Sequence, residues 1–441
     1  MTVEKLGVPT APIITNTFEW PVKDAVFAKG MSNLRFTFVP HPVAYRPAEE
    51  CREKILGNDP VTGKQVMLEI IEALTEPLTE EEKKVGSLER PRDKLVRPDT
   101  PDNLQALFRD NGWTLYTPII LPTKEKVAEM LKGTSHSPDE KVGEMQPSSP
   151  HEKWSYTVEQ VAVNAVMAGA KAEFFPVILA LASIGATSLF TSTNSFTAMM
   201  CVNGPIRNEI NMNMSVGALG PFNHANASIG SCWTLISKNL GHGGSPGHNY
   251  MGSQGQGHDY NNLCFAEREE RLPPGWNPFH VQKGFKLEES VVSVFDGWSW
   301  SNMGGFESNK DYTIKRFFET NTQCCGATMV IDPLVAMMLQ KDLGYQSKEQ
   351  LSKWLKENVM MNQQEYWGYP DVTMRGHAEE LEKARAGVEP YASWLKLPEG
   401  AVIPVPRNID VNIIVSGGET NPYWQGGTLR YIGSASIDKW R

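Results

Sequence analysis

TVEQVAVNAVMAGAKAEFFPVILALASI (Thr157–Ile184) and FTAMMCVNGP (Phe196–Pro205) are the two stretches of sequence that decide the fold. The first begins with a threonine suited to cap a helix, and its apolar residues recur at helical spacing up to Gly169. Its second half, Phe174–Ile184, predicts an apolar and buried helix. The other stretch predicts a strand over Phe196–Val202 that ends in an Asn-Gly-Pro turn.

Further short strands follow along the chain, separated by helical or glycine-rich segments. The predicted strands are Phe196–Val202, Ser290–Phe295, Ala327–Ile331 and Val411–Val415. Apolar strands bounded by helices are typical of an α/β fold with mixed or mainly parallel sheets covered by helices. Because 441 residues are too many for one small core, we expect two or more packed units. No internal repeat of fixed period is visible.

The N-terminal part predicts a smaller unit. Residues 1–74 contain a strand over Leu34–Val39 with two helices behind it, over Pro47–Leu56 and Lys64–Leu74, and we expect a βα-type unit. Residues 75–112 begin with a charged, proline-containing stretch that indicates a connector or an arm laid over a partner.

The main α/β domain is expected over residues 113–441, with a glycine-rich central segment. It should open with a strand over Trp113–Leu121 and a helix over Thr123–Leu131, for which Thr123 is a suitable N-cap. A polar loop is expected from Gly133 to Lys153.

Composition narrows the class of protein. A net charge of -9 argues against a nucleic-acid or anionic-membrane partner, since phosphates are bound mainly by Lys and Arg. No apolar run reaches the roughly 20 residues of a membrane span, and no secretory signal is visible. The six cysteines have no regular spacing and predict reduced thiols in a cytoplasmic protein.

Several blocks of the main domain resemble a family of bacterial proteins related to the UGSC (seleno)proteins, which are described as thiol oxidoreductases. The blocks are Thr157–Ala180, Val202–Ile210, Gly217–Gly230, Leu263–Glu270, Pro278–Phe285, IDPLVAMMLQKDLGYQSKEQL and Ile413–Glu419. In addition, FVPHPVAYRPAEE in the N-terminal unit is similar to the tail of a UGSC domain. The resemblance implies a member of this group acting on a small molecule.

Two departures from the family weaken a thiol mechanism inside this chain. Ala170 stands where the compared members have Cys. The family's redox motif is Sec or Cys followed by Gly-Ser-Cys, and Ile229–Cys232 matches it only in part, because Ile229 replaces the first residue. A dithiol cycle needs one thiolate to attack and a second to resolve. We therefore expect a separate thiol-bearing subunit, or a free thiol, within a homo- or hetero-oligomer.

Two glycine turns and one asparagine-containing loop are the candidate substrate-binding segments. Asn203 and Gly204 follow a strand, as do Gly417 and Gly418, and ligands of open α/β sheets bind beyond the carboxyl ends of strands. If both turns lie at one sheet edge, they form a single crevice. Asn223 and Asn226 lie near a helix start, where free backbone N–H groups could bind an anion. For each segment, a purely structural turn is an equally supported interpretation.

The loop Gly241–His258, called here the histidine loop, is the candidate metal site. His242, His248 and His258 could bind Zn, Fe or Cu, with Glu267 or His280 completing the site. The spacing matches no standard zinc motif, so surface or hydrogen-bonding histidines are the favoured alternative.

The candidate catalytic residues are Cys264, Glu267 and His280. Cys264 would be a nucleophile if a neighbouring cation lowered its pKa, and Glu267 or His280 could act as acid or base. The alternative is a buried Cys264 with Glu267 in an ion pair.

Together these patterns predict an enzyme, or the large subunit of one. It would act on a small polar or anionic metabolite by thiol- or metal-assisted redox or lyase chemistry. A metal-dependent hydratase or hydrolase using the histidine loop is one alternative, and a non-catalytic scaffold subunit is the other.

Overall fold

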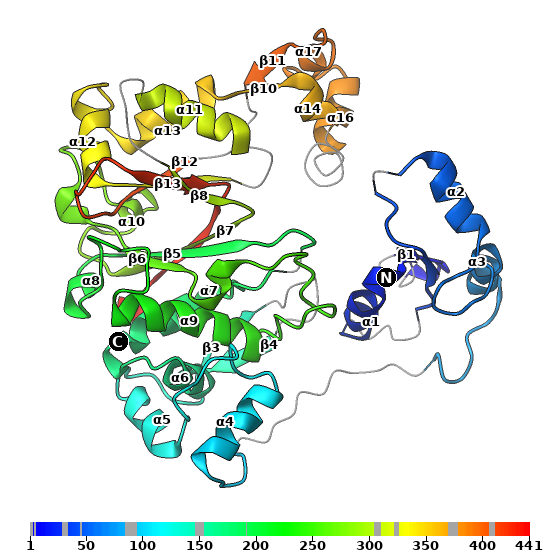
Figure 1. Ribbon diagram of the computed structural model, residues 1–441, viewed down its shortest axis with the longest axis horizontal. Helices are drawn as coiled ribbons and strands as arrows, with labels where there is room; N and C mark the ends of the chain where they lie inside the picture. The colour runs from blue at the N-terminus through cyan, green and yellow to red at the C-terminus, as the bar shows by residue number, and fades with distance from the viewer. Residues whose placement is uncertain are drawn as a thin grey trace.

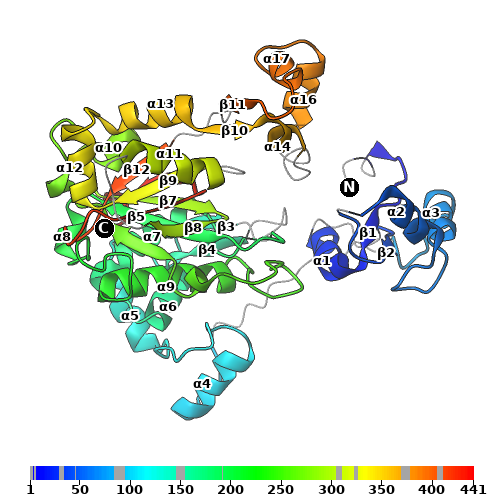
Figure 2. The same ribbon diagram turned by 45° about the horizontal axis from the view of Figure 1, so that its top comes forward.

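The computed structural model shows two packed sheets with helices on both outer faces (Figures 1 and 2). It describes residues 3, 6–28, 34–44, 46–83, 95–145, 154–190, 192–303, 310–321, 326–368, 378–404 and 411–441. The order of layers is helices, first sheet, second sheet, helices. The α/β prediction with mixed sheets and several packed units is confirmed.

The first sheet has the strand order β14-β7-β5-β6. Its strands are β5 (Thr197–Asn203), β6 (Leu263–Ala266), β7 (Val291–Gly297) and β14 (Arg430–Ser436). β5 and β6 are parallel, whereas β7 is antiparallel to both β5 and β14. Alternate residues of each strand point to opposite faces, so every strand contributes to two different cores.

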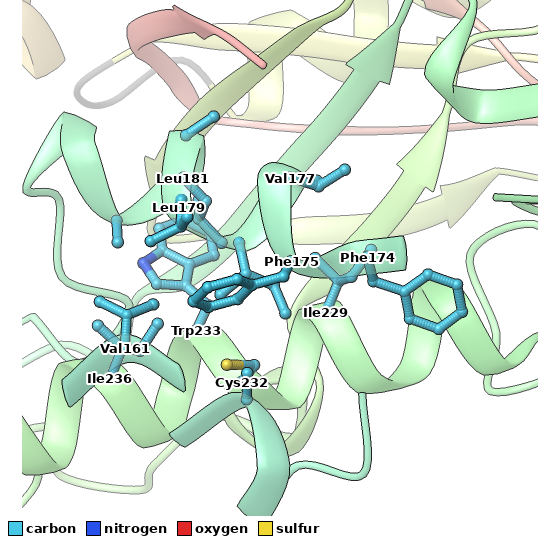
Figure 3. Close-up of a cluster of buried hydrophobic side chains, with 14 of the residues drawn as sticks. Val161, Phe174, Phe175, Val177, Leu179, Leu181, Ile229, Cys232, Trp233 and Ile236 are labelled. Carbon is cyan, nitrogen blue, oxygen red and sulfur yellow. The ribbon is translucent and has the colours of Figure 1, made fainter. Parts of the chain in front are cut away.

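The outer face of the first sheet packs against a helical layer. The helices on this side are α5 (Lys124–Leu131), α6 (Val158–Met167), α7 (Phe175–Ile184) and α9 (His224–Asn239). Figure 3 shows the aromatic centre of this core, where Phe175 of α7 and Trp233 of α9 are fully or almost fully buried. A capping box at Thr157 starts α6, as the sequence predicted for this residue.

The second sheet has the strand order β12-β9-β13-β8. Its strands are β8 (Trp300–Met303), β9 (Ala327–Ile331), β12 (Val411–Val415) and β13 (Trp424–Gly427). The helices α11 (Lys310–Asn321), α12 (Pro333–Lys341) and α13 (Lys348–Asn358) cover its outer face (Figure 1). The short elements α8 (Ile206–Glu209) and α10 (Phe279–Gln282) follow β5 and β6 along the chain.

A thin apolar layer joins the two sheets. Phe265 of β6 and Phe295 of β7 belong to the same buried cluster as Val330 of β9 and Ile414 of β12. Cys264 and Ala266 of β6 instead point to the helical core on the other side of the sheet. The faces of β6 therefore separate residues that are neighbours in sequence.

The two sheets exchange their last strands. β8 directly follows β7 of the first sheet but pairs with β13 of the second, and β14 directly follows β13 but pairs with β7. Each sheet also repeats the same order of directions, two parallel strands followed by two antiparallel steps. The fold thus contains an internal repeat of topology, although the sequence shows no repeat of fixed period.

The N-terminal unit lies beside this body (Figure 1). It contains β1 (Ile13–Thr15), α1 (Glu19–Ala28), β2 (Thr37–Val39), α2 (Ala48–Leu56) and α3 (Val66–Thr75). β1 and β2 are parallel, which makes a small βαβ unit. The aromatic ring of Trp20 in α1 packs at a tilt against His248 of the histidine loop, with 5.1 Å between ring centroids.

The remaining elements are short. They are α4 (Pro101–Asp110), β3 (Lys141–Met145), β4 (Trp154–Thr157), β10 (Met360–Asn362), α14 (Gln363–Gly368), α16 (Ala378–Arg385), α17 (Tyr391–Leu395) and β11 (Val402–Pro404). No helix in the part of the chain that the structure describes combines the length and apolar character of a membrane span.

Two sequence predictions are wrong at the level of single elements. Trp113–Leu121 forms no strand, because Pro118 lacks an N–H donor, Tyr116 adopts a positive φ of 62°, and the Gln105 side chain donates to the carbonyl oxygen of Ile119 at 2.8 Å. The expected polar loop from Gly133 to Lys153 instead contains the strand β3, which pairs with β4 directly after the predicted loop.

Candidate functional site

Charged and amide side chains gather where β5, β6 and β12 end, between the two sheets. We call this group the strand-end cluster. It consists of Asn203, Arg207, Glu267, Glu269, His280 and Lys348. Because β5 is parallel to β6, and Glu267 bonds the backbone of β12, three carboxyl ends meet at one place.

Glu267 is the centre of the cluster and is fully buried. Its Oε1 accepts hydrogen bonds from Lys348 Nζ at 2.6 Å and from the Val415 backbone N–H at 3.1 Å. Its Oε2 accepts from Asn203 Nδ2 at 2.8 Å and from the Phe279 backbone N–H at 2.6 Å. These four donors hold the carboxylate in one orientation and tie β5, β12, α10 and α13 together.

Glu269 lies one step further toward the surface, in the short 3-10 turn Glu269–Arg271. Its Oε1 accepts from Asn203 Nδ2 at 2.9 Å and from the Gly204 backbone N–H at 2.8 Å. Its Oε2 accepts from an Arg207 guanidinium N–H at 3.1 Å. The carboxylate of Glu269 is thus bound by three donors from the segment that follows β5.

Arg207 is buried and neutralised mainly by Glu270. The guanidinium makes two hydrogen bonds to the Glu270 carboxylate, at 2.7 and 2.9 Å, which is the bidentate geometry of strong pairs. This pairing lowers the pKa of Glu270 to about 2. The third guanidinium nitrogen, Arg207 Nε, is buried and has no hydrogen-bond partner among the described residues.

His280 lies against the cluster with one ring nitrogen unused. Its Nε2 is 3.3 Å from the carbonyl oxygen of Leu287, so Nε2 carries a proton. Its Nδ1 is 3.9 Å from Glu269 Oε1, too far for a hydrogen bond, and has no other partner in the described part of the chain. In the neutral ring, Nδ1 is therefore a free base inside the protein.

The turn at 417–418 lies beside the segment that follows β6. Gly417 accepts a hydrogen bond on its carbonyl oxygen from Arg268, which directly follows Glu267. However, protein atoms fill the space around both glycines. A side chain at Gly417 would contact Asp332, and one at Gly418 would approach the backbone of Val216 to 2.8 Å. This packing favours a structural role for the 417–418 turn.

Gly418→Val should therefore destabilise the protein by about 1–3 kcal/mol, because the new side chain overpacks the backbone of Val216. Urea unfolding measures the loss. Gly257→Val is the matched control, since a Cβ at Gly257 meets nothing within 4 Å. Equal stabilities of the two variants would contradict the structural role and restore the turn as a binding element.

The two candidate asparagines near the helix start have structural partners. Asn223 caps α9 by accepting from the Asn226 backbone N–H at 3.1 Å. Asn226 is fully buried and bonds the backbone of Asn213 in both directions. The helix begins at His224, directly after its cap residue Asn223 and two residues before the expected start at Asn226. Their role in substrate binding stays a prediction.

Cys264 is separated from the other two candidate catalytic residues. Its side chain belongs to the core between the first sheet and α9, on the opposite face of β6 from the interior of the sheets. Burial raises the pKa of the Cys264 thiol, and the same holds for Cys201 and Cys232. A buried thiol with a raised pKa is a poor nucleophile. Cys324 and Cys325 lie outside the described residues.

The histidine loop does not gather its histidines. Within the described ranges, no group of three or more His, Cys, Asp or Glu side chains could hold a metal ion. His242 packs against Trp154, His248 packs against Trp20, and the Nδ1 of His258 lies 3.4 Å from the Thr197 hydroxyl. Because each imidazole ring contacts a different part of the protein, the three rings do not face one metal ion.

The same loop contains a carboxyl group that the sequence did not single out. Burial raises the pKa of Asp259 to about 7, and its Oδ2 accepts a hydrogen bond from the Tyr250 hydroxyl at 3.1 Å. Its Oδ1 is buried and finds no partner in the described part of the chain. Asp259 directly follows His258, whose Nδ1 lies 3.4 Å from the Thr197 hydroxyl at the opposite end of β5 from the strand-end cluster.

The sequence also missed Arg207, Glu269 and Lys348 as members of the cluster. For Glu269 a signal existed, since the acidic run AEREE directly follows the strand β6. Lys348 gave none, because it lies 81 residues beyond Glu267 in an ordinary amphipathic helix.

Comparison with known proteins places a family match on the N-terminal unit. Residues 1–76 match the UGSC family, well under half of the 441 residues. No curated protein and no solved structure shows a significant match. The match includes the segment predicted to resemble the tail of a UGSC domain and assigns no reaction to the strand-end cluster.

Proposed function

We propose that the chain is an enzyme, or the large subunit of one, that binds a small anionic metabolite at the strand-end cluster and uses His280 as a general base. The observation that supports this most directly is the unpartnered, buried Nδ1 of His280 beside a carboxylate position. Polar atoms buried without a partner are rare in folded proteins, so such a nitrogen calls for a functional explanation.

The arrangement favours proton transfer over thiol chemistry. In a lyase-type reaction, a C–H bond of the metabolite would break, its proton would bind to Nδ1, and the electron pair would remain on the metabolite until the proton returns or a group leaves. The carbonyl oxygen of Leu287 holds the Nε2–H and so favours the tautomer in which Nδ1 is basic. Among the described cysteines, Cys201, Cys232 and Cys264 are buried, so none of these three offers an accessible thiol at this site.

We expect wild-type protein in D2O to incorporate deuterium at the carbon next to the carboxylate of a bound metabolite. His280→Gln should slow this exchange by about 100-fold or more, because the general base is lost. Proton NMR of a panel of small carboxylic and hydroxycarboxylic acids measures the exchange.

His224→Gln is the matched control, since the Nε2 of His224 also contacts a carbonyl oxygen, that of Gly169 at 2.7 Å, but on the exposed side of α9. A folded His280→Gln variant that exchanges as fast as His224→Gln would refute the base assignment. A chain that binds no small anion and exchanges no proton would instead fit the scaffold alternative.

A further inference from the structure

The donors around Glu269 form a compact group that binds one carboxylate. We call this group the carboxylate cradle. Its donors are Asn203 Nδ2, the Gly204 backbone N–H and an Arg207 guanidinium N–H, and the ring of His280 lies beside them with Nδ1 3.9 Å from Glu269 Oε1. Asn203 and His280 are fully buried and the side chain of Arg207 is 5% exposed, so the cradle is built into the interior.

Glu269 is not required to neutralise any cation in the cluster. Lys348 is paired with Glu267, and Arg207 makes two shorter bonds to Glu270, against one of 3.1 Å to Glu269. The negative charge of Glu269 is therefore in excess, and it is held mainly by the neutral donors of Asn203 and Gly204. The donors that bind this carboxylate have the chemistry to bind the carboxylate of another molecule in its place.

Glu269 is also the member of this arrangement that can leave. Its side chain is 11% exposed, whereas Glu267 is fully buried and bound by four donors. A side-chain rotation is enough to move the Glu269 carboxylate out, because its backbone is fixed separately by the Arg268 bond to Val415.

We propose that the carboxylate cradle is the binding site for the carboxylate group of a small ligand, and that Glu269 is an internal ligand which this carboxylate displaces. This inference rests on the proposed function for the location of the site, but its test needs no turnover. Displacement would leave Nδ1 of His280 facing the bound ligand instead of a protein carboxylate.

Glu269→Ala should empty the cradle and leave its donors unpaired. Added sodium acetate or malonate should then raise the melting temperature in a saturable way, with an affinity at least about tenfold higher than that of wild type, since no internal competitor remains. Wild type should bind the same anions weakly. Sodium chloride at equal ionic strength and sodium phosphate test whether the site distinguishes a carboxylate from other anions.

Glu419→Ala is the matched control, because Glu419 is also an ion-paired carboxylate but pairs with Arg268 and Arg271, neither of which is a donor of the cradle. It should bind carboxylates as wild type does. If Glu269→Ala folds poorly, Glu269→Gln removes the charge while keeping an oxygen acceptor, and it should show the same gain in smaller measure.

Either of two results would overturn the inference: no carboxylate-dependent stabilisation of the Glu269 variants, or no saturable binding to wild type at up to about 100 mM. The second would make Glu269 a permanent structural residue. Carboxylate binding without proton exchange would keep the cradle and reject the proposed function. Exchange without a gain on removing Glu269 would reject only the cradle.

Discussion

Lys348→Met should lower the free energy of unfolding by about 3–5 kcal/mol, since it leaves the carboxylate of Glu267 buried without its cation. Both side chains are at most 1% exposed, so water cannot replace the lost partner. The three neutral donors to Glu267 reduce the loss of stability, but they supply no positive charge to replace that of Lys348. Urea unfolding followed by circular dichroism measures the change.

Lys353→Met on the same helix is the control, because its side chain is 77% exposed and its change should stay within about 0.5 kcal/mol. The double variant Glu267→Gln/Lys348→Met should recover part of the stability, as it removes both charges. A Lys348→Met variant as stable as Lys353→Met would show that the buried pair does not hold the strand ends together.

Asp259→Asn should make the protein more stable than wild type at pH 8, by roughly 1–3 kcal/mol, and about equally stable near pH 4. Burial raises the pKa of Asp259 from an ordinary 3.8 to about 7, so between these values the folded state keeps a proton that the unfolded chain has released. The stability from this proton is present below about pH 4 and lost as pH rises through 7. Asn carries no such charge and still accepts from Tyr250.

Thermal unfolding of wild type and Asp259→Asn from pH 4 to pH 8 tests this expectation. Asp139→Asn, at an exposed position, should follow wild type over the whole range. Parallel curves for wild type and Asp259→Asn would mean that Asp259 is already ionised at pH 4 and that its surroundings stabilise the charge.

Local signals in the sequence predicted the elements that depend on local physics. The strands over Ala327–Ile331 and Val411–Val415 have the predicted bounds, because each is a mainly apolar run that is buried on both faces. Thr123 caps α5 as expected, accepting from the Lys126 backbone N–H at 3.4 Å. By contrast, β13 and β14 have the sequences WQGG and RYIGSAS. Glycine has a low strand propensity, so these strands depend on pairing with their neighbours and were not predicted from the sequence.

The candidate site was predictable only for residues beside a strand or a turn. Asn203, Glu267 and His280 were identified, and the structure brings them together, whereas Cys264 falls on the opposite face of β6. One step of alternation along a strand decides between these faces, and sequence alone does not say which face looks toward the second sheet. Lys348 depends on tertiary contact and had no local signal.

Because β8 and β14 are exchanged between the two sheets, neither sheet can be completed until both halves of the domain have been synthesised. The edge of β7 finds its partner only in residues 430–436, roughly 140 positions further along the chain, so the first half cannot close its sheet while the second is still being synthesised. During that interval an apolar strand edge is open to wrong pairing, including pairing with β14 of another copy. Once closed, neither half can detach without breaking the other, so both should melt in one cooperative step.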